Sequence, residues 1–219
     1  TSIPTGLFDK NINVTSFGHC FQSCEKISNI PTGLFDRNTK VTDFEYCFES
    51  CYNLTSIPTG LFDKNINVTS FYCCFQDCST LESIPERLFD KNIEVEAFNA
   101  CFSHCTNLKE IPKGLFDKNK KATNFMRCFS FCSNVTLNKN IFSNEGNTDR
   151  FSGMNMLFNY CFQNAGEQNE NPGEAPELWK YERGSSTWNT TGCFYNAKAT
   201  NLTSDNKYNT EWGTPLNWN

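Results

Sequence analysis

Most of the side chains that could do chemistry are cysteines, of which the chain has thirteen. A cysteine thiolate can bind a metal ion, attack a substrate or form a disulfide. A Cys-Phe-x-x-Cys motif recurs at Cys20/Cys24, Cys47/Cys51, Cys74/Cys78, Cys101/Cys105 and Cys128/Cys132. Zinc sites favour two residues between paired cysteines, whereas three stand between them here. The spacing therefore predicts no metal site.

The same pairs could be disulfides or buried packing groups. Two cysteines four residues apart on a helix have Cβ atoms farther apart than a disulfide usually allows. Degraded copies at Cys161 and Cys193 have Ala165 and Ala197 in the second position, so these cysteines lack a partner in their motif. Packing as a small buried hydrophobe fits this pattern better. The disulfide interpretation stays open, because an extracellular setting would permit it.

Cys73 lies outside the motif, on the predicted exposed face beside Cys74. We expect it to be a free surface thiol or a link to another chain. The two histidines, His19 and His104, belong to other repeats, so Cys73 has no evident base nearby in sequence. The chain also lacks a phosphate-binding glycine loop, a serine nucleophile elbow and an H-E-x-x-H motif. These observations predict no enzymatic activity and no cofactor.

The cysteine motif belongs to a repeat of 27 residues. The phenylalanine of a Leu-Phe-Asp triplet follows the same step, at Phe8, Phe35, Phe62, Phe89 and Phe116. Residues 1–135 are predicted to form five regular repeats, 136–200 two degenerate repeats with insertions, and 201–219 a C-terminal cap or tail. The chain opens in the middle of a repeat, so we expect the natural protein to extend upstream.

Within one repeat, the apolar residues predict a short helix followed by a short strand. Those between Val14 and Cys24 fall on one helical face at about 100° per residue. Ile27 and Ile30 would be inward residues of a strand that ends near Pro31, which cannot donate to a ladder. Such a coil can bury its apolar face only by stacking, with phenylalanine on phenylalanine along the axis. The sequence predicts an α/β repeat fold, a solenoid of about seven coils with short parallel strands and short helices.

Aspartate and asparagine recur in the turn that follows each Leu-Phe pair. They lie at Asp9/Asn11, Asp36/Asn38, Asp63/Asn65, Asp90/Asn92 and Asp117/Asn119. Stacked asparagine amides can bond the backbone of neighbouring turns, and aspartate can cap the helix that follows. A row of carboxylates that binds calcium is the alternative, but the dense oxygen-ligand spacing of a calcium loop is missing. Turn chemistry is the favoured interpretation.

The third repeat carries a family resemblance. Its sequence runs Leu54-Thr55-Ser56-Ile57, then Phe62-Asp63, then Val68-Thr69-Ser70-Phe71 and Cys74-Phe75-Gln76-Asp77-Cys78. This pattern resembles the BspA-like leucine-rich-repeat proteins, a bacterial surface-protein repeat family, although Phe and Cys replace two Met positions of that family. The resemblance covers residues 1–135 well and 136–200 loosely. It implies a right-handed leucine-rich-repeat-type solenoid, secreted or displayed on a bacterial cell surface, that serves adhesion or protein binding and has no active site.

Charge and hydropathy narrow the range of partners. The net charge is -5 and the sequence has no block of basic residues, so nothing in it indicates nucleic-acid binding. No apolar run approaches the length of about 20 residues that crosses a bilayer. The outward helix face varies from coil to coil, as a recognition surface would and as an unconstrained surface would too. Its candidate binding residues are Tyr46, Tyr72, Met126 and Arg127, whose types are common at hot spots.

We therefore expect a non-enzymatic adhesion or protein-interaction module for a host or matrix protein or a glycan. Two alternatives stay open. The solenoid could be a structural spacer or stalk that carries another domain. The C-terminal end could bind carbohydrate through its aromatic rings, although the same rings could simply cover the last coil. These rings belong to Trp179, Tyr181, Trp188, Tyr195, Tyr208, Trp212 and Trp218.

Overall fold

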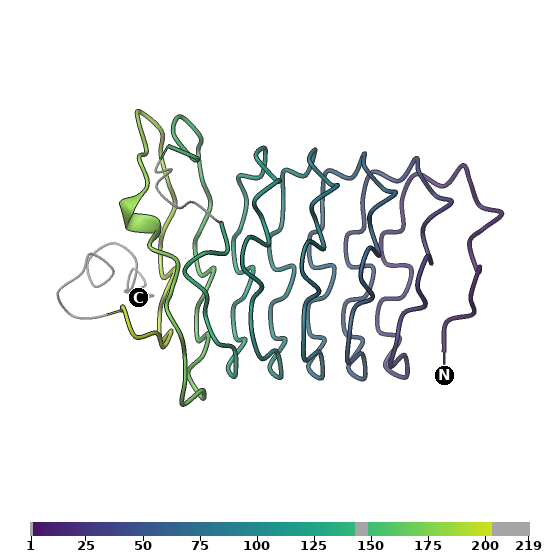
Figure 1. Ribbon diagram of the computed structural model, residues 1–219, viewed down its shortest axis with the longest axis horizontal. Coiled ribbons are helices and arrows are strands. Elements are labelled where there is room, and N and C mark those ends of the chain that lie inside the picture. Colours follow the sequence, from purple (N-terminus) through teal and green to yellow (C-terminus); the bar gives the residue numbers. More distant parts are fainter. Residues whose placement is uncertain (1, 143–148, 203–219) are drawn as a thin grey trace, which may run out of the picture.

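The computed structural model describes residues 2–142 and 149–202. They form similar coils that stack side by side along one axis (Figure 1). Bonds join residues 27 apart, such as the Asn38 amide and the Asn11 carbonyl at 3.0 Å. The repeat seen in the sequence is therefore the unit of stacking. Residues 203–219, which are most of the expected cap or tail, lie outside the described part.

The prediction of an α/β solenoid with short helices and short strands is wrong. The described residues contain no α-helix, and their one regular helix is a 3-10 turn, η1, at Leu178–Lys180. Strand contacts are reduced to isolated parallel bridges, such as Ser16 with Asp43 and Ser56 with Ser83. These bridges form no sheet, so turns and irregular backbone make up nearly every coil.

Consecutive turns replace the predicted helix between Val14 and Cys24. The N–H groups of Phe17 and His19 donate to carbonyls of the next coil at 3.2 and 2.9 Å. The N–H of the following residue, Cys20, donates to the Phe17 carbonyl at 3.1 Å, which closes a turn within the coil. A helix would keep all of these bonds inside the segment. Four-residue turns also bring apolar residues back every three or four positions, so their spacing resembles that of a helix.

These turns require left-handed backbone at two positions of each coil, and residues other than glycine occupy them everywhere except at Gly192 in the last described coil. The first position is held by His19, Tyr46, Cys73, Ala100, Arg127 and Tyr160. The second is held by Ser23, Ser50, Asp77, His104, Phe131, Asn164 and Asn196. Left-handed backbone costs a non-glycine residue about 1–2 kcal/mol. Backbone hydrogen bonds to the next coil fix these positions in every coil before that of Asn196, so the stack offsets a local cost that no isolated coil would bear.

Phenylalanine ladders form the core, as the sequence predicted. One ladder stacks Phe35, Phe62 and Phe89 with ring centroids 6.3 and 6.2 Å apart and nearly parallel planes. Parallel ladders run through Phe71 and Phe98 and through Phe75 and Phe102. These rings are fully buried. Each middle coil is therefore covered on both sides by its neighbours.

The motif cysteines are free thiols, and from the second coil onward they pack in this core, whereas Cys20 is exposed and Cys24 partly buried in the first coil. The Sγ atoms of Cys51, Cys78 and Cys105 donate to phenylalanine carbonyls of the preceding coil at 3.2–3.3 Å. Ala165 takes the second cysteine position in a later coil and is also fully buried. The structure thus agrees with the packing interpretation and contains no disulfide. Cys73 is only 3% exposed, so the expectation of a surface thiol is wrong.

An asparagine ladder joins the turns on another side of the coil, as predicted. The Nδ2 atom of Asn65 donates to the carbonyls of Phe35 and Asn38 at 3.2 and 2.9 Å, and the next coils repeat both bonds. In the first degenerate coil, the Arg150 guanidinium takes over this task and donates to the Phe116 carbonyl at 2.8 Å. Arg150 was not foreseen, because an insertion moves it out of the 27-residue register.

Arg87 allows a test of the cost of left-handed backbone at a residue other than glycine. It has a φ of 62° where Gly33 and Gly60 have 75° and 73°. We expect Arg87→Gly to raise the free energy of unfolding by about 0.5–1 kcal/mol, because relief of left-handed strain exceeds the added freedom of the unfolded chain. The lost ion pair to Asp90 matters little, since the Arg87 side chain is 81% exposed. Urea denaturation measures the difference.

The reverse change, Gly60→Arg, is the matched control and should destabilise the protein. A loss of stability in Arg87→Gly would contradict the left-handed assignment at this position.

Candidate functional site

The variable residues of the coils form one surface, which we call the turn face. It comprises the side chains at positions 18, 19, 22 and 23 of the first coil and their equivalents in later coils. All four sequence candidates lie on it. The Tyr46 and Tyr72 rings meet edge to face with centroids 4.8 Å apart. The Arg127 guanidinium lies over the Tyr160 ring, 5.5 Å from its centroid.

Three of the four candidates line a single cavity of about 360 Å³, which we call the turn-face cavity. Its lining comprises Tyr72, Cys73, Gln76, Ala100, Ser103, His104, Met126, Arg127, Ser130, Phe131 and Gln163. Tyr46 is not part of the lining and touches it through Tyr72. The structure therefore brings together Tyr72, Met126 and Arg127, and it places Tyr46 beside them.

Small side chains in the fourth coil create this cavity. Ala100 stands at the position that Arg127 occupies one coil later, and Ser103 stands at the position of Gln76 one coil earlier. Both are buried. Tyr72 and Met126 belong to the third and fifth coils, so they stand on either side of this low point. In the row of Ala100 the third coil carries Cys73, which is also small and buried, so the gap between Tyr46 and Arg127 is two coils wide.

Arg127 is the only residue with a permanent charge among those that line the turn-face cavity. It is exposed, and no other described residue forms an ion pair or a side-chain hydrogen bond with its guanidinium. Neither aspartate nor glutamate lines the cavity, although acidic residues outnumber basic ones in the chain. The site therefore presents a single positive charge above an apolar and amide-rich floor.

Much of the hydrogen-bonding capacity of the lining is already used within the protein. The Ser103 hydroxyl donates to the Ser130 carbonyl at 3.3 Å, and the Ser130 hydroxyl donates to the Gln163 side chain at 3.4 Å. The Gln76 amide donates to the Asp77 carboxylate at 3.0 Å. These internal bonds hold the polar part of the lining in place and leave Arg127 as its main unused donor.

A serine, a histidine and an aspartate meet at the edge of the cavity without the geometry of a catalytic triad. The Ser103 hydroxyl lies 2.9 Å from Nδ1 of His104, and Asp77 lies 3.9 Å from the same nitrogen. A triad needs the two partners on opposite ring nitrogens. The His104 ring instead stacks on Phe131, with centroids 4.6 Å apart. From the sequence, His104 is considered only as a possible base for Cys73 and Phe131 is not named, although both occupy a variable position of the repeat.

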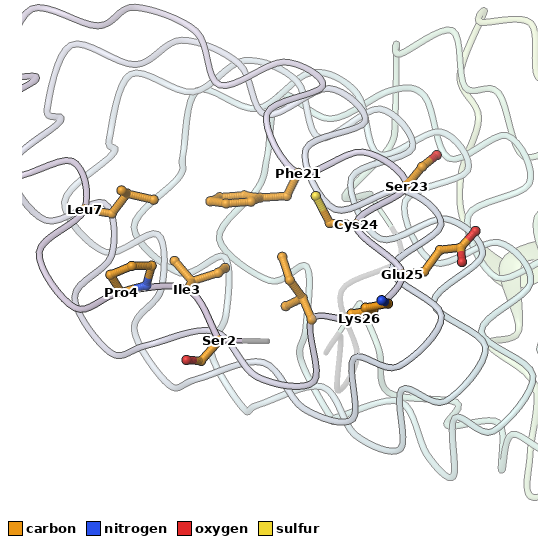
Figure 2. Close-up of a pocket in the computed structure, with 10 residues that line it drawn as sticks. Ser2, Ile3, Pro4, Leu7, Phe21, Ser23, Cys24, Glu25 and Lys26 are labelled. Carbon is orange, nitrogen blue, oxygen red and sulfur yellow. The ribbon is translucent and has the colours of Figure 1, made fainter.

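A larger cavity lies elsewhere, at the open side of the first coil (Figure 2). It measures about 500 Å³, and its lining includes Ile3, Phe21, Cys24 and Ile27. The equivalents of these residues in later coils are core residues that a preceding coil covers. Phe21 is 8% exposed, whereas Phe48 is fully buried. We therefore assign this cavity to the end of the stack rather than to recognition.

The described aromatic rings at the C-terminal end pack against the core. Trp179 meets Phe194 edge to face at 6.0 Å, and Trp188 meets Phe151 at 5.8 Å. Tyr181 also contacts Phe151, at 5.0 Å. Tyr195 is partly exposed on the turn face. The remaining rings proposed for sugar binding, Tyr208, Trp212 and Trp218, lie outside the described residues.

The described residues contain no group of three or more His, Cys, Asp or Glu side chains placed to hold a metal ion. They also contain no helix that is long and apolar enough to cross a membrane.

Comparisons with known proteins assign no family. The chain matches no protein-family model, and no curated protein matches its sequence. It is weakly similar to a chain of the Toll–Spatzle complex, a molecular hub in Drosophila development and innate immunity. The TM-score is 0.35 at 16% identity, over 75% of this chain and 24% of that chain. For the glycosylated form the TM-score is 0.14 at 16% identity, over 71% of this chain and 34% of that chain.

Proposed function

We propose that this protein is a non-enzymatic binding module that holds its ligand on the turn face, at the turn-face cavity. The observation that carries the proposal is that Tyr72, Met126 and Arg127 converge on one hollow. Tyrosine and arginine dominate the energetics of many interfaces, and such residues act best around a pocket that excludes water. The volume of about 360 Å³ is within the range of small-ligand sites.

The scaffold supports this proposal because it is common to all coils while the turn face is not. Core phenylalanines and asparagines repeat from coil to coil, whereas equivalent turn-face positions carry Cys73, Ala100 and Arg127. The left-handed turns beneath them are fixed by hydrogen bonds between coils, as at Cys73 and Ala100. Side chains on such a backbone are held in place before a ligand arrives, which lowers the entropy lost on binding.

We further propose an adhesion role, with a host or matrix protein or a glycan as the ligand, on a bacterial surface or in the surrounding medium. The support for this finer statement is the resemblance of the third repeat to BspA-like proteins. Binding of sugars by the C-terminal rings is less favoured, because Trp179, Tyr181 and Trp188 are partly buried against the core.

A binding screen tests the proposal. The chain is screened by biolayer interferometry against immobilised matrix proteins and glycans, beside a variant with Tyr46, Tyr72 and Arg127 changed to Ala. We expect saturable binding that this variant loses. The matched control changes Tyr52 and Ile66, which are exposed but lie off the turn face, to Ala. Equal binding by all three proteins would contradict the assignment to the turn face, and no binding at all would favour a spacer.

A further inference from the structure

We propose that the turn-face cavity recognises an aromatic carboxylate, such as an aromatic residue at the C-terminus of a peptide. The ring would lie over Ala100 in the cavity that Tyr72 and Met126 help to line, and the carboxylate would pair with Arg127. This inference rests on the proposed function and names the ligand chemistry of the same site.

The turn-face cavity, at about 360 Å³, has room for one flat ring. In the core beneath, Phe98 of the fourth coil stacks 5.9 Å from Phe71 and 5.7 Å from Phe125. In the outer row that contains Ala100, the third and fourth coils carry the small side chains Cys73 and Ala100. A ligand ring over Ala100 would therefore extend outside the protein the stacking that phenylalanines make inside it. Tyr72 and Met126, which belong to the adjacent row and also line the cavity, offer the aromatic and thioether contacts that such a ring favours.

The charge of the lining selects an anion. Arg127 is its one permanent charge, and no carboxylate lies in the lining to repel an anionic ligand. Contact with the Tyr160 ring holds the guanidinium plane, so less freedom is lost when a carboxylate pairs with it in a two-pronged manner.

The remaining chemistry argues against a sugar acid as the source of the carboxylate. A sugar needs several hydrogen-bond partners, but the hydroxyls of Ser103 and Ser130 and the amide of Gln76 already donate within the protein. The lining exposes polar and apolar surface in nearly equal amounts, and Tyr72, Met126 and Phe131 supply its ring and thioether contacts. A ring with little hydrogen-bonding demand and one carboxylate is the ligand that this combination fits.

Titration by NMR with three probes tests the inference. N-acetylphenylalanine carries the carboxylate, its amide is the neutral match, and glucuronate is the sugar acid. We expect the acid to bind at least about tenfold more tightly than the amide, as one charge-assisted pair would give. Arg127→Gln should abolish this difference, and glucuronate should bind more weakly than the acid.

Equal affinity for acid and amide, tighter binding of glucuronate, or no binding of any probe would each overturn the inference. If a partner from the binding screen still required the turn face, the proposed function would stand without it. If that partner bound elsewhere while the acid bound at Arg127, the carboxylate site would stand alone.

Discussion

Replacement of Phe62 by Ala is expected to lower the free energy of unfolding by about 3–5 kcal/mol, as for other fully buried phenylalanines. The Phe62 ring has no exposed surface and lies 4.7 Å from both Phe44 and Phe71. It also stacks between Phe35 and Phe89 in neighbouring coils. The substitution therefore leaves one cavity and removes ring contacts with residues of three coils. Equilibrium unfolding in urea, followed by tryptophan fluorescence, measures the loss.

Phe8 is the matched control, because it occupies the same position in the first coil but is only partly buried. Phe8→Ala should cost clearly less than Phe62→Ala. Equal losses, or a loss below about 1 kcal/mol for Phe62→Ala, would contradict the stacked core.

Alkaline pH is expected to unfold the protein between about pH 10 and 11, because the core holds many protonated thiols. Burial raises the pKa of these thiols above the usual 9.0, to about 12 for Cys132. The other fully buried thiols with a raised pKa are Cys47, Cys74, Cys78, Cys101, Cys105, Cys128, Cys161 and Cys193. Circular dichroism and urea unfolding at stepped pH values measure the effect.

The direction follows from which state binds more protons. Below pH 9 the thiols are neutral in both states, and their contribution to stability is fully present. Above pH 9 the unfolded chain releases thiol protons that the folded chain keeps, so stability falls until the folded pKa, about 12 for Cys132, is reached. Each such thiol lowers the free energy of unfolding by about 1.4 kcal/mol per pH unit, and a domain has only about 5–15 kcal/mol to lose.

Lysine and tyrosine also titrate in this range, so the slope against pH needs a cysteine-specific control. Cys105→Ala combined with Cys132→Ala removes two of the thiols, and Ala165 and Ala197 already hold this position in later coils. The variant should lose stability less steeply between pH 9 and 11. An identical slope would show that the buried thiols do not cause the alkaline transition.

The stack and its core could be predicted from the sequence because they depend on residues that recur at a fixed step. Phe35, Phe62 and Phe89 must meet if equivalent positions of successive coils lie side by side, and Asn65 must meet the backbone of the coil before it. The local backbone could not be predicted in the same way. A left-handed position is normally recognised in a sequence because glycine occupies it. Here His19 and Tyr46 hold such positions, and hydrogen bonds between coils stabilise them.

The candidate site was predictable in part for the same reason. Tyr72, Met126 and Arg127 were placed on one outward face because they occupy variable positions of the repeat. The cavity itself depends on the small side chains of Ala100 and Ser103, and a search for hot-spot residue types passes over such positions. A comparison of side-chain sizes at equivalent positions of successive coils would have revealed the gap.

Whether the ligand binds in the turn-face cavity is tested most sharply by the affinity of an Ala100→Tyr variant for the strongest ligand from the binding screen. Tyr46 and Tyr160 occupy the equivalent position with a similar φ, so the backbone accepts tyrosine there and the new ring fills the turn-face cavity. Ala100→Ser is the control that leaves the cavity open. We expect Ala100→Tyr to weaken binding at least about tenfold, while the affinity of Ala100→Ser and the unfolding midpoints of both variants change little. Unchanged affinity in a folded Ala100→Tyr variant would contradict binding in this cavity.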